Sequence, residues 1–425
     1  MMLKKMVLEA LKIIVLIVFV SLIISFYQWL AHQIVSLSDW LIASNWLLTG
    51  AIALLFCTCL IYLNRKVPGY SGSGIPQVEA YHAGWYSFNP FWMMGLVFIN
   101  SLMSFFSGFL LGGEGPSVTI ASSMALSVNR LFHKEDKELV ACCGSAGFAC
   151  AFLSPLAGLF HLLEENRSVL KLSLLLKGVL IIVVSSFLAQ WIYPHRLLAI
   201  TFDTLFPYDL FYVFLLVVLV GVTVGKLYIF FIAKIKDLSL RFRYFYWIAF
   251  ALVVLCLVFK RYLPQMSGSG TYLLENRLVS MGLLWLVVLL IGRMLGTAFC
   301  NATLFSGGLV LPMLALGALS GEIVVAFVAF FRSDIVLYED LIKICAMFTV
   351  FAVVCKTPLT AIALSLQTGA YDVVLLPVSI CVLTSFVIVS LFKWPNIYQE
   401  LEKGFRDTHF IIKNDNGISG CRSWN

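Results

Sequence analysis

The sequence has 425 residues, of which 61% are hydrophobic and 12% are charged, and its mean hydropathy is +0.97. Soluble domains carry about 45–50% apolar and about 25% charged residues, so this composition excludes a soluble protein. The net charge of +7 comes from basic residues near the chain ends and in short loops. By the positive-inside rule these residues indicate cytoplasmic edges, with both termini in the cytoplasm, and no nucleic-acid partner.

Long apolar stretches recur along the whole chain. They lie near 10–31, 45–63, 90–111, 139–163, 170–192, 209–233, 244–260, 277–300, 308–331, 341–366 and 373–393. Since a spanning helix needs about 20 mostly apolar residues, the sequence predicts an all-α polytopic membrane protein with roughly ten or more membrane segments. The first stretch is too long for a signal peptide and has no cleavage pattern, so we interpret it as a retained helix.

Cysteines do not indicate a metal or disulfide site. The eleven cysteines lie mostly inside the apolar stretches and show no Cys-x-x-Cys spacing beside histidines. They are best interpreted as small buried side chains. We therefore expect neither a zinc site nor a cofactor.

Short motifs recur in the same order in two halves of the chain. Ser-Gly-Ser-Gly at 71–74 returns at 267–270, an offset of 196 residues, and Gly-Gly at 112–113 returns at 307–308, an offset of 195. Ser-Pro-Leu-Ala at 154–157 is echoed by Thr-Pro-Leu-Thr at 357–360, an offset of 203. Such repeats, with interrupted apolar helices, are typical of transporter folds. We expect an N-terminal helix (1–39), a first transmembrane half (40–235), a second half (236–395), and a C-terminal cytoplasmic helix and tail (396–425).

Three of the interruptions have the form expected of an anion site. A helix N-terminus presents unpaired backbone N–H groups and the positive end of the helix dipole, which together can replace the water around an anion. Glycine allows close approach of the backbone, and proline favours the first helical turn. The segments are Gly72-Ser73-Gly74-Ile75-Pro76, Gly113-Glu114-Gly115-Pro116 and Gly307-Gly308-Leu309-Val310-Leu311-Pro312. A single such motif more often serves helix packing; three of them favour a shared binding site.

Ionisable residues within apolar stretches are functional hypotheses by default. Glu114 lies inside one predicted helix start, where its carboxylate competes with an anion for the same N–H groups and leaves when protonated. Glu164 and Glu165 lie at the end of an apolar helix and are candidates for a functional role. The alternative is that they form an ordinary helix end at the membrane interface and pair with Arg167. Arg293 is expected to have a structural role, through pairing or snorkelling.

These three segments, in this order, resemble the signature segments of the CLC family of chloride channels and chloride/proton antiporters, and the resemblance extends from about residue 40 to residue 400. It implies a homodimer with one pathway per subunit, built from an inverted repeat of tilted, broken helices. By similarity, Ser73 and Tyr398 contact the anion through their hydroxyls, and Leu309 and Val310 offer backbone N–H groups. Glu114 matches the external gating glutamate, and Glu165 the internal proton-transfer glutamate of the antiporters.

The sequence departs from the family pattern at several positions. Gly113 stands where Lys or Arg is usual, Val310 replaces a phenylalanine, Leu311 replaces a small residue, and Gln367 falls where many members have glutamate. Ser73 favours chloride over nitrate, and Gly72-Ser73-Gly74-Ile75-Pro76 argues against the fluoride-selective branch. The chain after Tyr398 is too short for the nucleotide-binding domains of eukaryotic relatives. We therefore expect the inner (plasma) membrane of a bacterium.

The predicted function is secondary active exchange of chloride, or a similar small anion, for protons across a lipid bilayer. Chloride is then the substrate, and no cofactor is required. A passive, voltage- or pH-gated chloride channel is the alternative, since Gly113 and Val310 could loosen the gate. A membrane enzyme using Glu114 with His161 or Glu165 is disfavoured, because the sequence shows no nucleophile beside a base, no metal cluster and no cofactor fingerprint.

Overall fold

The computed structural model describes residues 2–66, 70–84, 86–132, 136–165, 171–195, 211–241 and 245–403. Within these ranges the chain is almost entirely helical, and strand-like pairing is limited to two isolated β-bridges. The all-α prediction is therefore confirmed. Seven of the described helices are long and apolar enough to cross a membrane.

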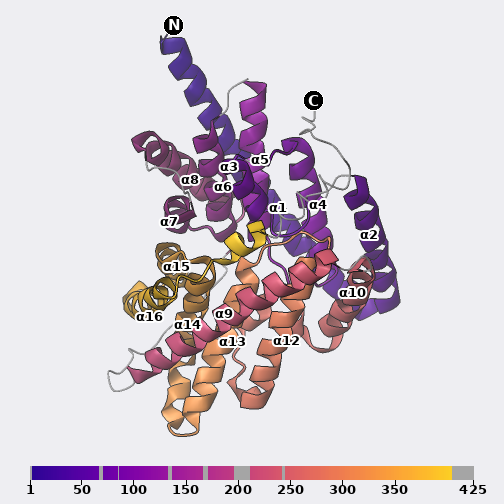
Figure 1. The fold of residues 1–425 in the computed structure, drawn as a ribbon, viewed down its shortest axis with the longest axis vertical. Helices are drawn as coiled ribbons and strands as arrows, with labels where there is room; N and C mark the ends of the chain where they lie inside the picture. Colours follow the sequence, from indigo (N-terminus) through magenta and orange to yellow (C-terminus); the bar gives the residue numbers. More distant parts are fainter. Residues whose placement is uncertain are drawn as a thin grey trace.

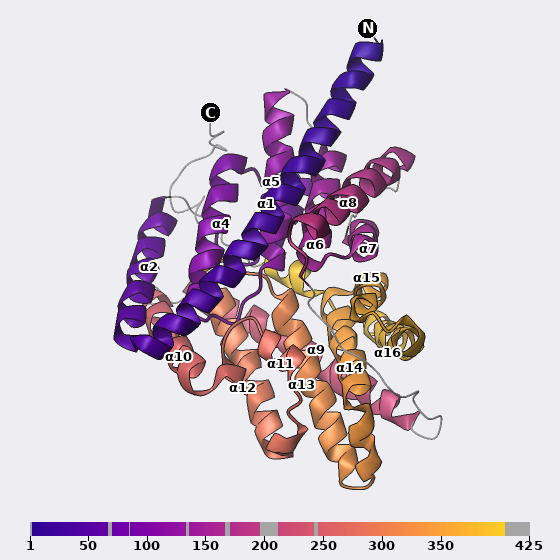
Figure 2. The same cartoon turned by 180° about the vertical axis from the view of Figure 1, so that it is seen from behind.

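The first eight helices form one half of the molecule, drawn in indigo to magenta in Figure 1. They are α1 (Met2–Ser44), α2 (Trp46–Lys66), α3 (Ile75–His82), α4 (Pro90–Phe106), α5 (Glu114–Leu131), α6 (Lys137–Phe152), α7 (Pro155–Glu165) and α8 (Leu172–Ile192). The long helix α1 crosses the back of this half and packs against α4, α6 and α8 (Figure 2). It thus belongs to the first half and does not form a separate element.

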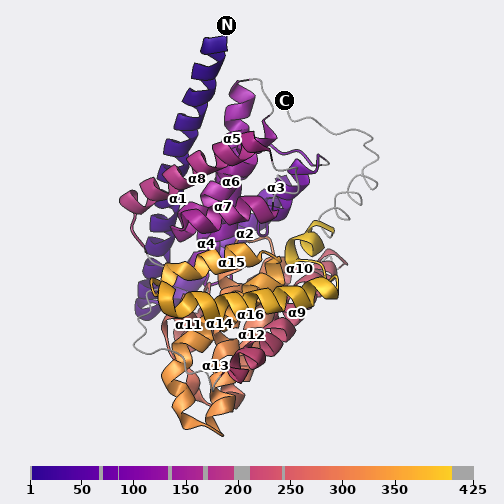
Figure 3. The same cartoon turned by 90° about the vertical axis from the view of Figure 1, so that its left-hand side faces the viewer.

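The second eight helices form the other half, drawn in pink to yellow. They are α9 (Tyr212–Arg241), α10 (Phe245–Tyr262), α11 (Thr271–Glu275), α12 (Leu283–Ala302), α13 (Val310–Ala329), α14 (Glu339–Cys355), α15 (Pro358–Ser365) and α16 (Tyr371–Leu391). Four short 3-10 segments complete this half: Pro264–Met266, Val279–Met281, Ser333–Tyr338 and Leu366–Thr368. A last helical segment, 397–403, lies at the level where the two halves meet (Figure 1 and Figure 3).

The helices of the two halves correspond in order. The pairs α3 and α11, α5 and α13, and α7 and α15 begin at the offsets seen in the sequence motifs. Helix α9 packs against α12, α13, α14 and α16. The predicted boundary between 235 and 236 therefore falls inside a helix of the second half, and the two sets of eight helices separate between α8 and α9.

Two of the predicted apolar stretches are broken in the same way. The stretch 139–163 is divided into α6 and α7 at Leu153, with φ of 52°, and the stretch 341–366 into α14 and α15 at Lys356, with φ of 61°. In both places a proline follows two residues later, at Pro155 and Pro358, and starts the next helix. Because proline disfavours a helical conformation in the residue before it, each apolar run ends and restarts in a new direction. Figure 3 shows the resulting short helices α7 and α15 lying side by side.

Candidate functional site

The glycine-rich loops of both halves meet at the centre of the fold. The Gly72 N–H donates to Phe305 O at 3.2 Å, and the Gly307 N–H donates to Gly72 O at 3.1 Å. Gly112 and Gly308 exchange two backbone hydrogen bonds, of 2.8 and 2.6 Å. The three motifs that the sequence singled out, far apart in the chain, are thus joined by main-chain contacts.

Gly115 shows how closely the three loops approach one another. A Cβ atom added there would overlap the Ser73 carbonyl oxygen and lie 3.0 Å from the Gly308 Cα. Gly74 has φ of 80° and caps α3, and the corresponding Gly270 has φ of 110° and caps α11. Such left-handed conformations favour glycine, which lets the chain turn sharply into a helix at this depth.

Polar side chains brace the loops from behind. The Asn100 Nδ2 donates to Leu304 O at 2.9 Å and to Ser306 Oγ at 3.0 Å, and the Ser306 hydroxyl donates to Tyr70 O at 2.7 Å. Asn100 and Ser306 are fully buried. A lone asparagine inside the apolar stretch 90–111 was the sequence signal for this brace, and our prediction did not use it.

Three helices begin at the point where the loops meet. α3 begins after Gly74, α5 after Gly113 and α13 after Leu309, and none of these three N-cap residues makes a side-chain cap hydrogen bond. Pro76, Pro116 and Pro312 lie in the first turns and are buried, as are Ile75, Leu309 and Val310. The structure therefore gathers uncapped helix starts, with their free N–H groups and positive dipole ends, inside the protein.

Ser73 and Glu114 bring polar oxygens to this point. Each side chain is 3% exposed, and neither Ser73 Oγ nor Glu114 Oε2 has a hydrogen-bond partner among the described residues. The Glu114 carboxylate interacts with the backbone amides of Gly113, Glu114 and Leu311, and its Oε2 lies against Gly112 and Gly308. A buried polar group without a partner is costly, so the unpaired Ser73 hydroxyl points to a ligand that this place binds.

Tyr398 lies on the last helical segment, 397–403. It is 2% exposed, and its hydroxyl forms a hydrogen bond with Cys355 at the end of α14. The Cys355 Sγ lies 3.6 Å from the Met313 Sδ, in the first turn of α13. Tyr398 also interacts electrostatically with Glu165 and Glu79. Through Cys355 and Met313, Tyr398 is thus connected to the first turn of α13.

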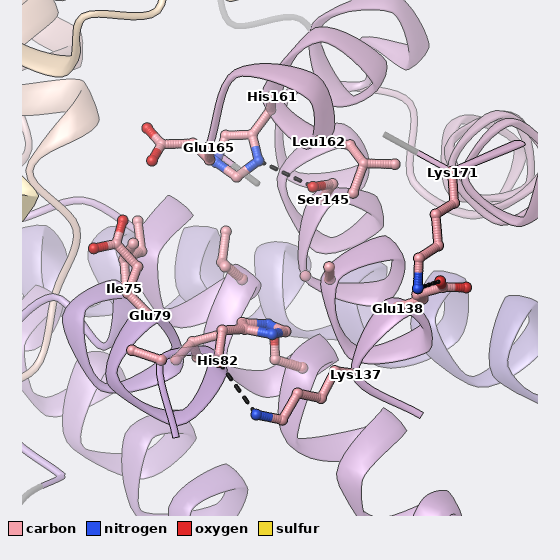
Figure 4. A pocket seen from close by; sticks show the side chains of 16 residues that line it. Ile75, Glu79, His82, Lys137, Glu138, Ser145, His161, Leu162, Glu165 and Lys171 are labelled. Atoms are coloured by element: carbon pink, nitrogen blue, oxygen red, sulfur yellow. Dashed lines mark hydrogen bonds and ion pairs between the residues drawn. The ribbon is translucent and has the colours of Figure 1, made fainter. Parts of the chain in front are cut away.

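Glu165 faces a cavity whose lining is mainly apolar and carries several titratable side chains. This space of about 420 Å³ is enclosed by α3, α5, α6 and α7, and Figure 4 shows Glu165, Glu79 and His161 around it. Its inner end is lined by the buried side chains Ile75 and Val118. Because Val118 lies one helical turn after Glu114 on α5, the cavity ends close to the start of that helix.

Glu164, the neighbour of Glu165, has a different role. Its carboxylate accepts hydrogen bonds from Leu359 N at 2.8 Å, Thr360 N at 2.9 Å and Thr360 Oγ1 at 2.6 Å. It thus caps the N-terminus of α15 from the other half, a partner the sequence analysis did not find. The proposed alternative partner, Arg167, lies outside the described residues.

Arg293 is buried inside the second half, with 1% of its surface exposed. Its guanidinium donates to the carbonyl oxygens of Gln265, Ser267 and Gly268 at 2.7–3.2 Å. The predicted structural role is confirmed, in the form of pairing to the Ser-Gly-Ser-Gly loop and not as snorkelling. Gln367 likewise has a structural contact, donating to Leu153 O at 3.0 Å.

Known proteins resemble this chain over most of its length. It is 28% identical over 409 residues to the H(+)/Cl(-) exchange transporter ClcA of Vibrio campbellii, covering 91% of this chain and 84% of that protein. The Cronobacter sakazakii transporter of the same name is 27% identical over 375 residues, covering 83% and 79%.

Solved structures share the fold. A slow cyanobacterial Cl-/H+ antiporter superposes with a TM-score of 0.84 at 21% identity, covering 94% of this chain and 97% of that one. A CLC-type fluoride/proton antiporter gives 0.75 at 20% identity, covering 92% and 96%. The family model for the voltage gated chloride channel matches residues 54–390. This match covers most of the sequence and includes the three converging loops, so the chain belongs to the voltage gated chloride channel family.

Proposed function

We propose that this protein is a secondary active antiporter that exchanges chloride for protons. The observation that carries the proposal is the position of Glu114, whose carboxylate lies against Gly112 and Gly308 where three uncapped helix starts meet. A titratable anion thereby occupies the place that the backbone N–H groups make suitable for chloride. The similarity to proteins named as H(+)/Cl(-) exchange transporters supports the same assignment.

Competition between the carboxylate and the halide couples the two substrates. Ionised Glu114 satisfies the amides around it, and a chloride ion that takes its place needs the side chain to leave. Protonation removes the negative charge that those N–H groups stabilise, so it releases the side chain. Entry of chloride and uptake of a proton by Glu114 then favour each other.

The anion path would use hydroxyl and amide donors rather than a fixed positive charge. Ser73 Oγ and the N–H groups of Leu309 and Val310 would bind the central chloride, and the Tyr398 hydroxyl would close the site on the other side. A site without a full cation holds the ion less strongly, which allows release and therefore transport. Glu165 would pass protons between the inner cavity and Glu114.

The assembly and topology are part of the same proposal. Each half, α1–α8 and α9–α16, would be one inverted repeat, and two chains would form a homodimer with one pathway each. The protein would lie in a bacterial inner membrane with both termini in the cytoplasm. Crosslinking of the purified protein in a bilayer tests the dimer, since a monomeric transporter would contradict it.

Flux measurements in proteoliposomes test the exchange itself. An imposed chloride gradient should drive protons uphill, against their own gradient, at zero membrane potential. Chloride flux without any uphill proton movement would overturn exchange and favour a passive channel. The same assay with fluoride and nitrate tests the preference expected from Ser73.

A further inference from the structure

The inner cavity contains a titratable side chain that the proposed exchange has not yet used. His161 lies on α7, and its ring faces the space enclosed by α3, α5, α6 and α7 (Figure 4). His161 and Glu165 are four residues apart on one helix, so they share a face with about 5–6 Å between their Cβ atoms. An imidazole is the side chain best suited to exchange protons near neutral pH.

The ring is held in a defined orientation. Its Nδ1 lies 3.1 Å from the Ser145 Oγ on α6, and its face stacks on Phe148, with 4.6 Å between ring centroids and 19° between planes. When Nδ1 carries the hydrogen and donates it to Ser145, Nε2 is the free basic atom. Ser145 therefore fixes the orientation of the ring, and in this tautomer the other ring nitrogen can accept a proton.

The cavity connects exposed residues with buried ones. Lys137 and Lys171 on its lining are exposed, whereas Ile75 and Val118 at its inner end are buried. Ser122, also on the lining, is fully buried and its Oγ has no hydrogen-bond partner among the described residues. A space of about 420 Å³ with several polar groups can hold ordered water, which conducts protons between donors and acceptors.

Charged groups of both signs face the cavity around His161. They are Glu79 and His82 on α3, Lys137 and Glu138 on α6, Glu165 on α7, and Lys171. Lys137 donates to His82 O at 3.2 Å, and Lys171 lies 3.8 Å from Glu138. The exposed residues Lys137 and Lys171 therefore already have partners, His82 and Glu138. Glu79 and Glu165 interact electrostatically with Tyr398.

We propose that His161 is the proton relay between water in this cavity and Glu165. Nε2 takes a proton that comes from the solution along the cavity water, so the ring becomes an imidazolium ion and the water stays neutral. The ring then gives a proton to the Glu165 carboxylate directly or through one water. The ring returns to its neutral form, and no other reactant is consumed. The inference rests on the proposed exchange, because it concerns the route by which Glu165 receives its proton.

The test uses the full-length protein in proteoliposomes. His161→Gln and His161→Leu should keep chloride flux, which shows that the variants fold, and should lower the rate of chloride-driven proton uptake about tenfold or more, since a positioned proton-transfer group contributes at least that much. The pH profile of proton uptake should lose one titrating step, because these side chains replace the ionisable imidazole. His195→Asn is the matched control, because His195 is not part of the cavity lining, contacts Tyr193 and Ala151 O among the described residues, and should keep the wild-type rate.

Chemical rescue separates a relay from a structural role. In His161→Gly, added imidazole should enter the space that the side chain leaves and restore proton uptake. If His161→Gln transports protons at the wild-type rate with an unchanged pH profile, the relay is wrong and exchange stands. A loss that imidazole does not restore, and that is equal at every pH, assigns His161 to packing. If the wild-type protein moves no protons uphill, the proposed exchange itself fails before His161 is tested.

Discussion

The two halves of the molecule share one scaffold but differ in chemistry. Both start helices at glycine-rich loops in the centre, yet the titratable and hydroxyl side chains of the pathway belong mainly to the first half. At the repeat offsets, Glu114 corresponds to Val310, Ser122 to Ala318, His161 to Leu364, Glu165 to Thr368, and Glu79 to the exposed Glu275. The repeated architecture therefore supplies helix starts from both halves, whereas the titratable side chains of the proposed proton route are concentrated in the first half.

The two halves bind each other through similar contacts at equivalent positions. Glu164 in the last turn of α7 caps the start of α15, and its counterpart Gln367 after α15 binds Leu153, just before α7. The two short helices therefore brace one another reciprocally. The two contacts differ in strength, since Glu164 accepts three hydrogen bonds whereas Gln367 donates one.

Glu114→Gln should have the largest effect, because it removes the titratable group that distinguishes α5 from α13. We expect chloride flux to continue and uphill proton transport to disappear completely, since glutamine neither ionises nor carries a proton. Simultaneous chloride and proton flux measurements check this. Proton transport at the wild-type rate would show that the coupling group lies elsewhere.

Glu165→Gln should remove proton movement and spare chloride. The substitution keeps the shape of the side chain beside Tyr398 but cannot accept a proton from the cavity. Glu164→Gln is a matched control at the neighbouring position, where the side chain caps α15, and it should retain coupling. Full exchange in Glu165→Gln would reassign the inner proton site.

Gly115→Ala should force apart the three glycine-rich loops that meet at the centre of the fold. Because the new methyl group meets the backbone of Ser73 and Gly308, we expect a loss of about 3 kcal/mol in stability together with impaired chloride flux. Gly50→Ala on α2, where nothing lies within 4 Å, should instead be neutral or stabilise the protein by about 0.5–1 kcal/mol. Thermal unfolding in detergent compares the two, and equal effects would contradict the close approach.

Substitutions in the reciprocal contacts between α7 and α15 should have the smallest effects, and these effects concern stability. Glu164→Ala leaves the N–H groups of Leu359 and Thr360 without their acceptor and should cost about 1–3 kcal/mol. Gln367→Ala removes one hydrogen bond and should cost about 0.5–1.5 kcal/mol. Thermal unfolding of the two single variants shows which loses more stability. A larger loss for Gln367→Ala would contradict the prediction that the Glu164 contact is the stronger of the two.

Sequence reasoning identified the loops but not what surrounds them. Glycine, proline and repeat spacing predicted that the segments at 72–76, 113–116 and 307–312 act together, because these residues mark backbone interruptions that must turn inward. The roles of Asn100 and Glu164 depend on partners about 200 residues away in the chain, which local patterns do not reveal. The sequence marks the helix breaks at Leu153 and Lys356 with Ser154-Pro155 and Thr357-Pro358. Because the apolar character continues across both breaks, hydropathy alone predicted one stretch at each place.

The mutual hydrogen bonds of Gly112 and Gly308 bear on how the protein is made. Helix α5 is not among the described helices apolar enough to insert alone, and its buried serines and Glu114 need neighbours. During synthesis, the amides around Glu114 lack their partners until the second half of the chain has left the ribosome. The anion site is therefore completed late in biogenesis, and a chain truncated before α13 should be recognised and degraded by membrane quality control.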